Sequence, residues 1–521
     1  MLPLEYVDRR WLTLSTGCLL MVCAGNIYAF GLWSGPLVET WPQEDKDRSG
    51  VISNRLYECL LVGAYIPLGG FFYQRYGTKK ALLMAAVCNN VAFFIIIGQF
   101  FTGDQHSPDL ISYIGFFLMG QATSYTDCTV VSTNVANWAA AERTSAVALL
   151  KGYFGLSASI LSMMAATGVT TKQFLVGLGF ANTFLLVLGA FVCKVISISD
   201  MNQNQDRKKS LHMALLVELV IAGVLFIRSI FFGVDNMIVS LLFAITVIPL
   251  LCSTYVMPIL CKGSERDYAP MGKLEPPEDS SGDGHLVEIP SSETEKPVNN
   301  TKPLDVLDAM LSIEFWLFFT SLLIIMGSGL FIVSNASKMV EAKGGTSSQV
   351  HVFVSIVSVS NCLGRIGVGF IADHAILLRH GICRISLLMV SCMFMALAHM
   401  LFAACGVVGI TIAGFFGGLA YGSAWTLDPS ILADIVGLKY FGKIYAFLGF
   451  APTLGSMFFS TLLATHVYES NAHILEGTQH RECHGSSCFG LAHVITACIN
   501  LLAAVVLVPL LRRRLQGRMS S

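Results

Sequence analysis

The sequence predicts an all-α polytopic membrane protein with about fourteen transmembrane helices. Of its 521 residues, 54% are hydrophobic and only 13% are charged, which is too little charge to cover the surface of a soluble protein of this length. Apolar runs of about twenty residues, the length that spans a bilayer as a helix, recur along nearly the whole chain. Six such runs precede a pair of further runs and six follow it, so we expect two six-helix bundles with two extra helices between them.

The composition and the motifs also limit the kinds of partner and activity that we expect. The net charge of −1 favours no nucleic-acid partner, and the expected surroundings are a lipid bilayer. No P-loop pattern occurs, so an ATP-driven pump is not indicated. No His–Glu or His–His pair at helical spacing stands out in the spans, and we therefore expect no enzyme, no metal and no cofactor. A monomer is expected to suffice, and the oligomeric state is left open.

Each predicted span is an apolar run bounded by polar or charged residues. The N-terminal bundle, residues 1–197, contains the spans 11–34, 52–73, 80–103, 109–135, 145–167 and 173–197. The inserted pair, residues 198–257, contains the spans 211–233 and 235–257. The C-terminal bundle, residues 309–514, contains the spans 315–336, 348–372, 384–405, 407–430, 442–466 and 489–511.

A polar segment separates the inserted pair from the C-terminal bundle. Residues 258–308 are rich in Ser, Pro and acidic residues, a composition that predicts a disordered cytoplasmic linker. Lys and Arg concentrate in the loops that a cytoplasmic N-terminus would place inside. Both termini, including a short tail at residues 515–521, are therefore expected in the cytoplasm. The plasma membrane and an endolysosomal or vacuolar membrane both remain open.

A short motif occurs once in each bundle, after its second span. The first copy is GGFFYQRYGTKK at residues 69–80, and the second is GVGFIADH at residues 367–374. The first resembles the loop motif Gly-x-x-x-Asp-Arg-x-Gly-Arg-Lys of the major facilitator superfamily, with Gln74 and Thr78 as departures. This resemblance implies a gating motif made of Gly70, Arg75, Gly77, Lys79, Gly369 and Asp373.

Two further segments narrow the resemblance. ALLKGYFGLSASI at residues 148–160 and NCLGRIGVGFIAD at residues 361–373 resemble segments of nodulin-like transporters, which are related to monocarboxylate and oxalate/formate transporters. The resemblance implies secondary active or facilitative transport of a small solute, an organic anion such as a monocarboxylate, by alternating access between two bundles. The alternative is a non-transporting membrane sensor or receptor that keeps the transporter fold and signals through residues 258–308.

Polar residues share one stripe of the fourth span. Thr123, Asp127, Asn134 and Asn137 lie four, seven and three residues apart, which places them on one helix face. An ionisable residue at membrane depth normally faces a cavity or a partner. Asp127 is therefore a candidate for proton coupling, and Asp127 and Asn134 are candidates for substrate binding. The alternative is that Asp127 bonds to a neighbouring helix and only fixes the packing.

Arg365 is a second candidate for substrate binding. In monocarboxylate transporters, which this segment resembles, the equivalent arginine pairs with the substrate carboxylate, and the residue four positions earlier is acidic. Here that position is Asn361. A guanidinium offers two parallel donors to a carboxylate. The alternative is that Arg365 ties its helix to Asp373 or reaches lipid headgroups. In the first span, Asn26 and Tyr28 are polar enough to line the same pathway.

Three other features carry weaker expectations. Lys151 begins the fifth helix, where we expect a headgroup or latch contact more than a substrate contact. Asp428 precedes Pro429, where we expect a kink near the membrane surface, with a broken helix that frames a site as the alternative. Cys483 and Cys488 follow a pattern that resembles one in nodulin-like proteins, and they are candidates for a disulfide on an oxidising side. A metal site at these cysteines and free thiols remain the alternatives.

Overall fold

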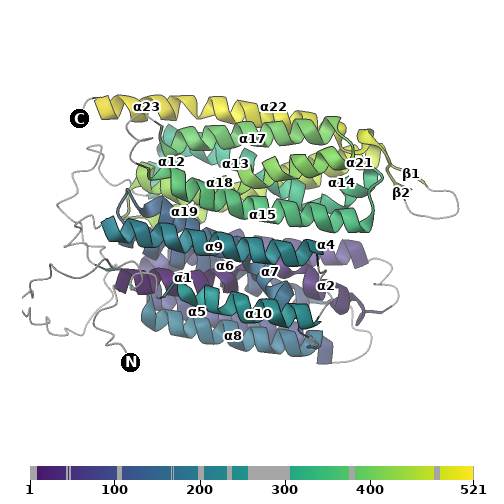
Figure 1. Ribbon diagram of the computed structural model, residues 1–521, viewed down its shortest axis with the longest axis horizontal. Coiled ribbons are helices and arrows are strands. Elements are labelled where there is room, and N and C mark those ends of the chain that lie inside the picture. The colour runs from purple at the N-terminus through teal and green to yellow at the C-terminus, as the bar shows by residue number, and fades with distance from the viewer. Residues whose placement is uncertain are drawn as a thin grey trace, which may run out of the picture.

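The protein is a bundle of long helices whose axes lie roughly along one common line (Figure 1). The computed structural model describes residues 9–42, 45, 49–101, 108–165, 167, 169–196, 205–231, 237–255, 306–374, 382–474 and 481–519. Within them, 11 helices are long and apolar enough to cross a membrane. Helices α4, α6 and α10 are also part of the bundle, so the expectation of about fourteen membrane helices is compatible with the structure.

The first half of the chain forms one group of helices. These are α1 (Arg9–Ala24), the 3-10 helix η2 (Gly25–Ala29), α2 (Gly31–Val38), α4 (Ser49–Tyr65), α5 (Leu68–Phe101), α6 (Leu110–Asn137), α7 (Arg143–Ala165) and α8 (Thr171–Val192). The 3-10 helix interrupts the predicted span 11–34, and Asn26 and Tyr28 lie in it. Asp109 and Thr170 begin α6 and α8 as caps, because each side chain accepts a hydrogen bond from the third residue of its helix.

The C-terminal half repeats the arrangement with more breaks. It contains α12 (Val306–Leu311), α13 (Ile313–Ser334), α14 (Ala336–Ala342), α15 (Ser347–Ala372), α17 (Arg384–Ala404), α18 (Val407–Val436), α19 (Phe441–Leu448), α20 (Phe450–Ser456), the π-helix η3 (Met457–Ala464), α21 (Thr465–Ser470), β1 (His473–Ile474), β2 (Arg481–Glu482), the 3-10 helix η4 (Ser486–Cys488), α22 (Gly490–Val506) and α23 (Val508–Met519). The predicted span 442–466 is thus a chain of short helices. The predicted tail at 515–521 continues α23 as far as Met519.

The two inserted helices do not have equal positions. They are α9 (Gln205–Phe231) and α10 (Met237–Ser253). Figure 1 shows α9 along the boundary between the purple-to-blue half and the green-to-yellow half, and α9 packs against both α7 and α15. Helix α10 packs against α9 and α7. The linker predicted at residues 258–308 lies outside the described residues except for its last three, which begin α12.

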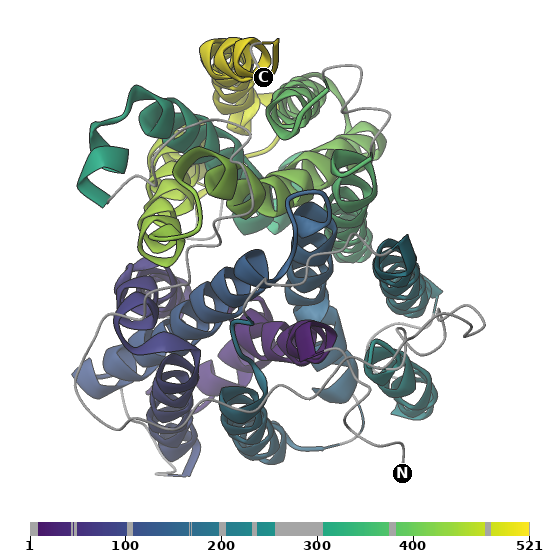
Figure 2. The ribbon, with the colours of Figure 1, turned by 90° about the vertical axis from the view of Figure 1, so that its left-hand side faces the viewer.

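Packing between helices is closest at glycines, and the outer surface is apolar. A Cβ on Gly120 of α6 would lie 2.1 Å from the carbonyl oxygen of Leu60 on α4, so a side chain there would push the two helices apart. Phe94 is 81% exposed and Phe180 is 73% exposed. Exposed aromatic side chains of this kind fit a surface that faces lipid rather than water. The fold is therefore that of a polytopic membrane protein, and Figure 2 shows its two halves end-on.

Candidate functional site

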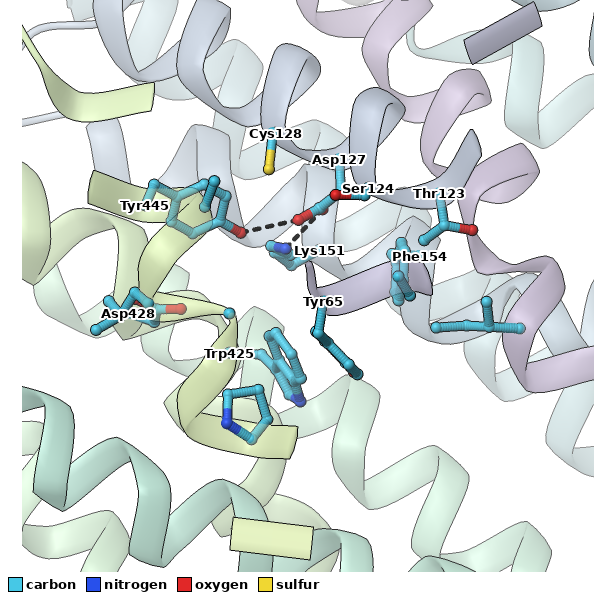
Figure 3. Close-up of a pocket in the computed structure, with 16 residues that line it drawn as sticks. Tyr65, Thr123, Ser124, Asp127, Cys128, Lys151, Phe154, Trp425, Asp428 and Tyr445 are labelled. Carbon is cyan, nitrogen blue, oxygen red and sulfur yellow. Dashed lines mark hydrogen bonds and ion pairs between the residues drawn. The ribbon is translucent and has the colours of Figure 1, made fainter. Parts of the chain in front are cut away.

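A cavity lies between the two halves, and both halves line it (Figure 3). Its polar and aromatic lining includes Tyr65, Asp127 and Lys151 from the first half, and Trp425, Asp428 and Tyr445 from the second half. The cavity leaves about 40 Å³ for the centres of water-sized molecules, which is room for a few waters. A position between the two repeats is where secondary transporters of this build hold their substrates.

Lys151 and Asp127 form an ion pair in this cavity. The Nζ atom of Lys151 lies 2.7 Å from Oδ1 of Asp127, and the side chains are 1% and 17% exposed. The hydroxyl of Tyr445, from the other half, donates to Oδ2 of Asp127 at 3.0 Å. The expectation that Lys151 contacts headgroups or a latch is therefore wrong. It rested on where the apolar run begins, but α7 begins eight residues before Lys151, which carries the lysine inward.

Aromatic rings surround the Lys151 ammonium. Its Nζ lies 5.2 Å from the ring centre of Trp425 and 5.5 Å from those of Phe154 and Tyr445. Such rings attract a cation through their quadrupole, most strongly where water is excluded. The rings and Asp127 together stabilise a positive charge in a part of the protein where an isolated charge would be costly.

Asp428 adds a second carboxyl group to the cavity. The residue is 4% exposed, and its Oδ1 has no hydrogen-bond partner within the described part of the chain. It interacts electrostatically with both Lys151 and Asp127. Helix α18 continues through Pro429 to Val436, so the broken helix named as the alternative is not observed, and the Asp428 carboxyl is buried rather than exposed. Two carboxyl groups thus share one lysine.

Arg365 lies beside this cavity but does not line it. It is fully buried, its Nε donates to Oδ1 of Asn361 at 2.8 Å, and its Nη1 donates to the backbone carbonyl of Lys151. It therefore makes neither of the contacts that the packing alternative named, Asp373 or lipid headgroups. Tyr28 interacts electrostatically with both Arg365 and Asp127. Arg365 and its partners are thus adjacent to the cavity, and the backbone of α7 separates them from it.

The glycines within residues 148–160 have a structural role. Lys151 points into the cavity, and its two neighbouring glycines make room for charged side chains from other helices. A Cβ on Gly152 would lie 2.0 Å from Oε1 of Glu218, and a Cβ on Gly155 would lie 3.2 Å from Cζ of Arg365. Glu218 is not among the predicted site residues. Its signal was a lone acidic residue in the apolar run 211–233, which is a functional-site hypothesis by default at membrane depth.

The other predicted binding residues are placed less centrally. Of the stripe on α6, Thr123 lines the cavity and donates to the carbonyl of Ala24 at 2.8 Å. Asn134 does not line the cavity, and its side chain donates to the carbonyl of Val130 at 2.9 Å. Asn26 is buried, and its side-chain oxygen has no hydrogen-bond partner among the described residues. Of the six residues predicted to bind substrate, only Asp127 lines the cavity.

The second copy of the gating motif closes one end of the molecule. Oδ2 of Asp373 accepts a hydrogen bond from the backbone nitrogen of Ser145, at the start of α7, at 2.9 Å. Oδ1 of Asp373 pairs with Arg384 at 2.8 Å, and Arg384 also pairs with Asp434 at 2.8 Å. A Cβ on Gly369 would lie 2.3 Å from Cβ of Ala148. The motif therefore joins α15 directly to α7 of the other half, and we call these contacts the latch.

The first copy makes a matching contact despite its departures. Gln74, which stands at the Asp position, donates to the carbonyl of Lys439 in the other half at 2.8 Å. Gly70 also contacts the other half, where it lies against the backbone carbonyl of Gly442. Gly77 has a φ of +76°, a conformation that favours glycine. The two basic residues of this copy contact aromatic rings of their own half: Arg75 lies over the ring of Tyr76, and Lys79 lies over the ring of Phe191.

The far end of the molecule carries the two cysteines singled out by the sequence. Cys483 and Cys488 are bonded to each other, with an S–S distance of 2.05 Å. Gly485, one of the four residues between them, donates from its backbone nitrogen to the carbonyl of Ala342. The disulfide therefore holds this loop against the end of α14.

Solved structures with the same fold include transporters whose sequences differ widely from this one. The human organic anion transporter MFSD10 (TETRAN) is 12% identical, with a TM-score of 0.56 over 96% of this chain and 99% of that chain. The fucose:proton symporter FucP of E. coli is 10% identical, with a TM-score of 0.51 over 97% of this chain and 98% of that chain. At these identities the likeness shows the fold, which is the major facilitator fold.

Sequence relatives and a family model narrow the assignment. The probable transporter MCH1 of Yarrowia lipolytica is 25% identical over 191 residues, and that of Candida glabrata is 36% identical over 107 residues. These matches cover 35% and 19% of this chain, and only 38% and 19% of the relatives' own length. A family model described as Nodulin-like matches residues 10–261. The first half of the chain is therefore similar to the Nodulin-like family. The matched region carries Asp127, Lys151 and Glu218, whereas Arg365 and the second gating motif lie beyond it.

Proposed function

We propose that this protein transports a small organic anion, such as a monocarboxylate, across a membrane by alternating access. The observation that carries the proposal is the buried, aromatic-caged Lys151, which faces a cavity lined by both halves. A lysine held in a buried site attracts a carboxylate strongly, because less solvent screens the charge there than at the surface. The fold, the relatives named probable transporters and the human structure named an organic anion transporter all support this proposal.

The ion pair itself gives a proposed route to proton coupling. Asp127 occupies Lys151 in this conformation, so an anion must compete with it. A proton on Asp127 would weaken the pair and leave the lysine to the anion. Asp428 would be a second acceptor in the same cavity. We therefore propose that an anion and a proton bind together, and that Asp127 is the group that couples them.

The latch supports a proposal for how the two halves move apart. Its contacts join the two halves at one end of the molecule, through Asp373 and Ser145 and through Gln74 and Lys439. For the halves to open at this end, these contacts must break and the cavity must widen. The alternation of a latched and an unlatched state is the proposed transport cycle, with Arg365, Asn361 and Tyr28 as the residues that an anion reaches as the cavity widens.

Uptake into proteoliposomes tests the proposed function. Purified protein would be assayed with labelled formate, acetate, L-lactate and pyruvate, with and without an inward pH gradient, and by counterflow. We expect one or more of these anions to enter, and entry to rise when the outside is acidic. Neither flux nor counterflow for any of the four would contradict the anion proposal, and saturable binding without flux would favour the sensor alternative.

A further inference from the structure

We propose that Glu218, on the inserted helix α9, is a proton-binding site that controls whether Arg365 is available to an anion. The anion part of this inference rests on the proposed function, and the proton part does not. It gives the inserted helices a role in the transport cycle.

Glu218 has an unusual position for a carboxyl group. It is fully buried, and both of its carboxyl oxygens have no hydrogen-bond partner within the described residues. Its Oε1 lies where a Cβ of Gly152 would be, so the backbone of α7 passes directly against it. A buried carboxylate without hydrogen bonds is costly, and a proton on the group removes most of that cost.

Arg365 is the partner that Glu218 would take when it loses its proton. The two side chains interact electrostatically, and they contact neighbouring turns of α7, Glu218 at Gly152 and Arg365 at Gly155. Nε and Nη1 of Arg365 have partners, but its Nη2 has none among the residues described. An unoccupied guanidinium nitrogen beside an unpaired carboxyl group fits a pair that forms in one state of the cycle and separates in another.

No other strongly charged group of the packed helices competes for Glu218. The titratable groups that face it are the arginine, two thiols and one phenol, from α15, α1 and α7: Arg365, Cys362, Cys18 and Tyr153. Helix α10 has no charged residue, and its Cys252 interacts with Tyr153. Arg365 is therefore the cation that responds to the charge of Glu218.

Helix α9 is attached so that it senses the latch. Lys208 donates to the backbone carbonyl of Asp373 at 2.9 Å, and the ring of His212 packs against that of Phe370 at 5.1 Å. Because α9 also packs against α7, it touches both halves where they meet. Movement of α15 away from α7 would therefore change the surroundings of Glu218.

The proposed step is a simple proton exchange. When the halves separate, the O–H bond of the Glu218 carboxyl breaks and the proton passes to water. The carboxylate then accepts a hydrogen bond from Nη2 of Arg365, and this pairing replaces an anion at the guanidinium. Rebinding of a proton reverses the step and frees Arg365.

Infrared difference spectroscopy tests the proton site without any substrate. Purified protein in lipid would be titrated from acid to alkaline pH, with Glu218→Gln and the exposed control Glu314→Gln beside the wild type. We expect a titrating band of a protonated, non-hydrogen-bonded carboxyl that Glu218→Gln lacks and Glu314→Gln keeps. Glu218→Asp should restore a titrating band, which separates loss of the group from misfolding. A band unchanged in Glu218→Gln, or no such band in the wild type, would overturn the inference.

Pyruvate transport tests the coupling to Arg365. In proteoliposomes, Glu218→Gln is expected to keep only the part of the stimulation of pyruvate uptake by a pH gradient that Asp127 provides, and to keep pyruvate counterflow at equal pH. Stimulation equal to that of the wild type would overturn the coupling. If the wild type moves none of the four carboxylates, the proposed function fails, and the infrared titration still decides the proton site.

Discussion

The ammonium of Lys151 lies 2.7 Å from Oδ1 of Asp127 in a cavity that both halves of the protein line. Each residue stabilises the charge of the other, so removing one leaves a charge buried alone. Breaking a buried pair in this way costs about 3–5 kcal/mol. We expect Lys151→Ala to lower the thermal stability of the detergent-solubilised protein more than the double variant Lys151→Ala/Asp127→Asn does. Equal loss in both would show that the pair is not buried as described.

Proton coupling at Asp127 has its own signature. Asp127→Asn removes the competing negative charge and the group that takes up the proton. We expect it to bind pyruvate at high pH as well as the wild type does at low pH, and to lose the acceleration of uptake by an acidic outside. The measurement is pyruvate binding and uptake across a range of pH values. A variant with an unchanged pH profile would place the coupling elsewhere.

Gly152 is expected to tolerate no side chain while Glu218 is present. A Cβ there would lie 2.0 Å from Oε1 of Glu218, and that overlap forces a shift of α9 or α7. Gly152→Ala should therefore lower thermal stability, and Glu218→Ala should recover part of the loss in the double variant. Gly155→Ala, with its nearest contact at 3.2 Å, should cost less. The prediction is contradicted if Glu218→Ala adds to the damage of Gly152→Ala.

The latch predicts a rate effect without a binding effect. Asp373→Asn removes the ion pair with Arg384 and weakens the hydrogen bond from Ser145, which favours the unlatched state. We expect slower pyruvate exchange, with the equilibrium affinity for pyruvate nearly unchanged. The control is Glu314→Gln, which removes the exposed pair with Arg513 and should leave both unchanged, because exposed pairs contribute about 0–1 kcal/mol. Loss of exchange in the control would point to a general effect of charge.

The disulfide predicts a local gain in stability. Cys483 and Cys488 close a short loop, and closing a loop of this size stabilises a protein by about 2 kcal/mol in the chain-entropy estimate. Cys483→Ser should therefore lower the melting temperature, and a reducing agent should do the same to the wild type and nothing further to the variant. An additional effect of the reducing agent on Cys483→Ser would mean that another bond is involved.

Much of the fold could be predicted because membrane helices have a strong and simple signal. The predicted spans 348–372 and 384–405 agree with α15 and α17 to within one residue. The approach failed where a helix changes character inside the membrane. The π-helix at Met457–Ala464 leaves no mark in average hydropathy, because its residues are as apolar as those of an α-helix. The 3-10 helix at Gly25–Ala29 has only five residues, which is too short to interrupt the apolar run 11–34.

The site was harder to predict, because a sequence does not show how deep in the bilayer a residue lies or which helix it faces. Asp127 is one of the predicted site residues and lines the cavity, but its partners Lys151 and Tyr445 come from other helices. Lys151 was assigned to an edge because it follows a polar loop. Glu218 carried a usable signal, a lone acidic residue within an apolar run. Its relation to Arg365 depends on the position of α9 between the halves, and no local pattern encodes that position.

Counterflow in proteoliposomes with Lys151→Ala, beside the exposed lysine variant Lys172→Ala, tests the central claim most directly. The account predicts that wild type and Lys172→Ala exchange at least one of formate, acetate, L-lactate and pyruvate, and that Lys151→Ala exchanges none of them. Exchange by Lys151→Ala at the rate of the wild type would contradict the claim that this lysine holds the transported anion.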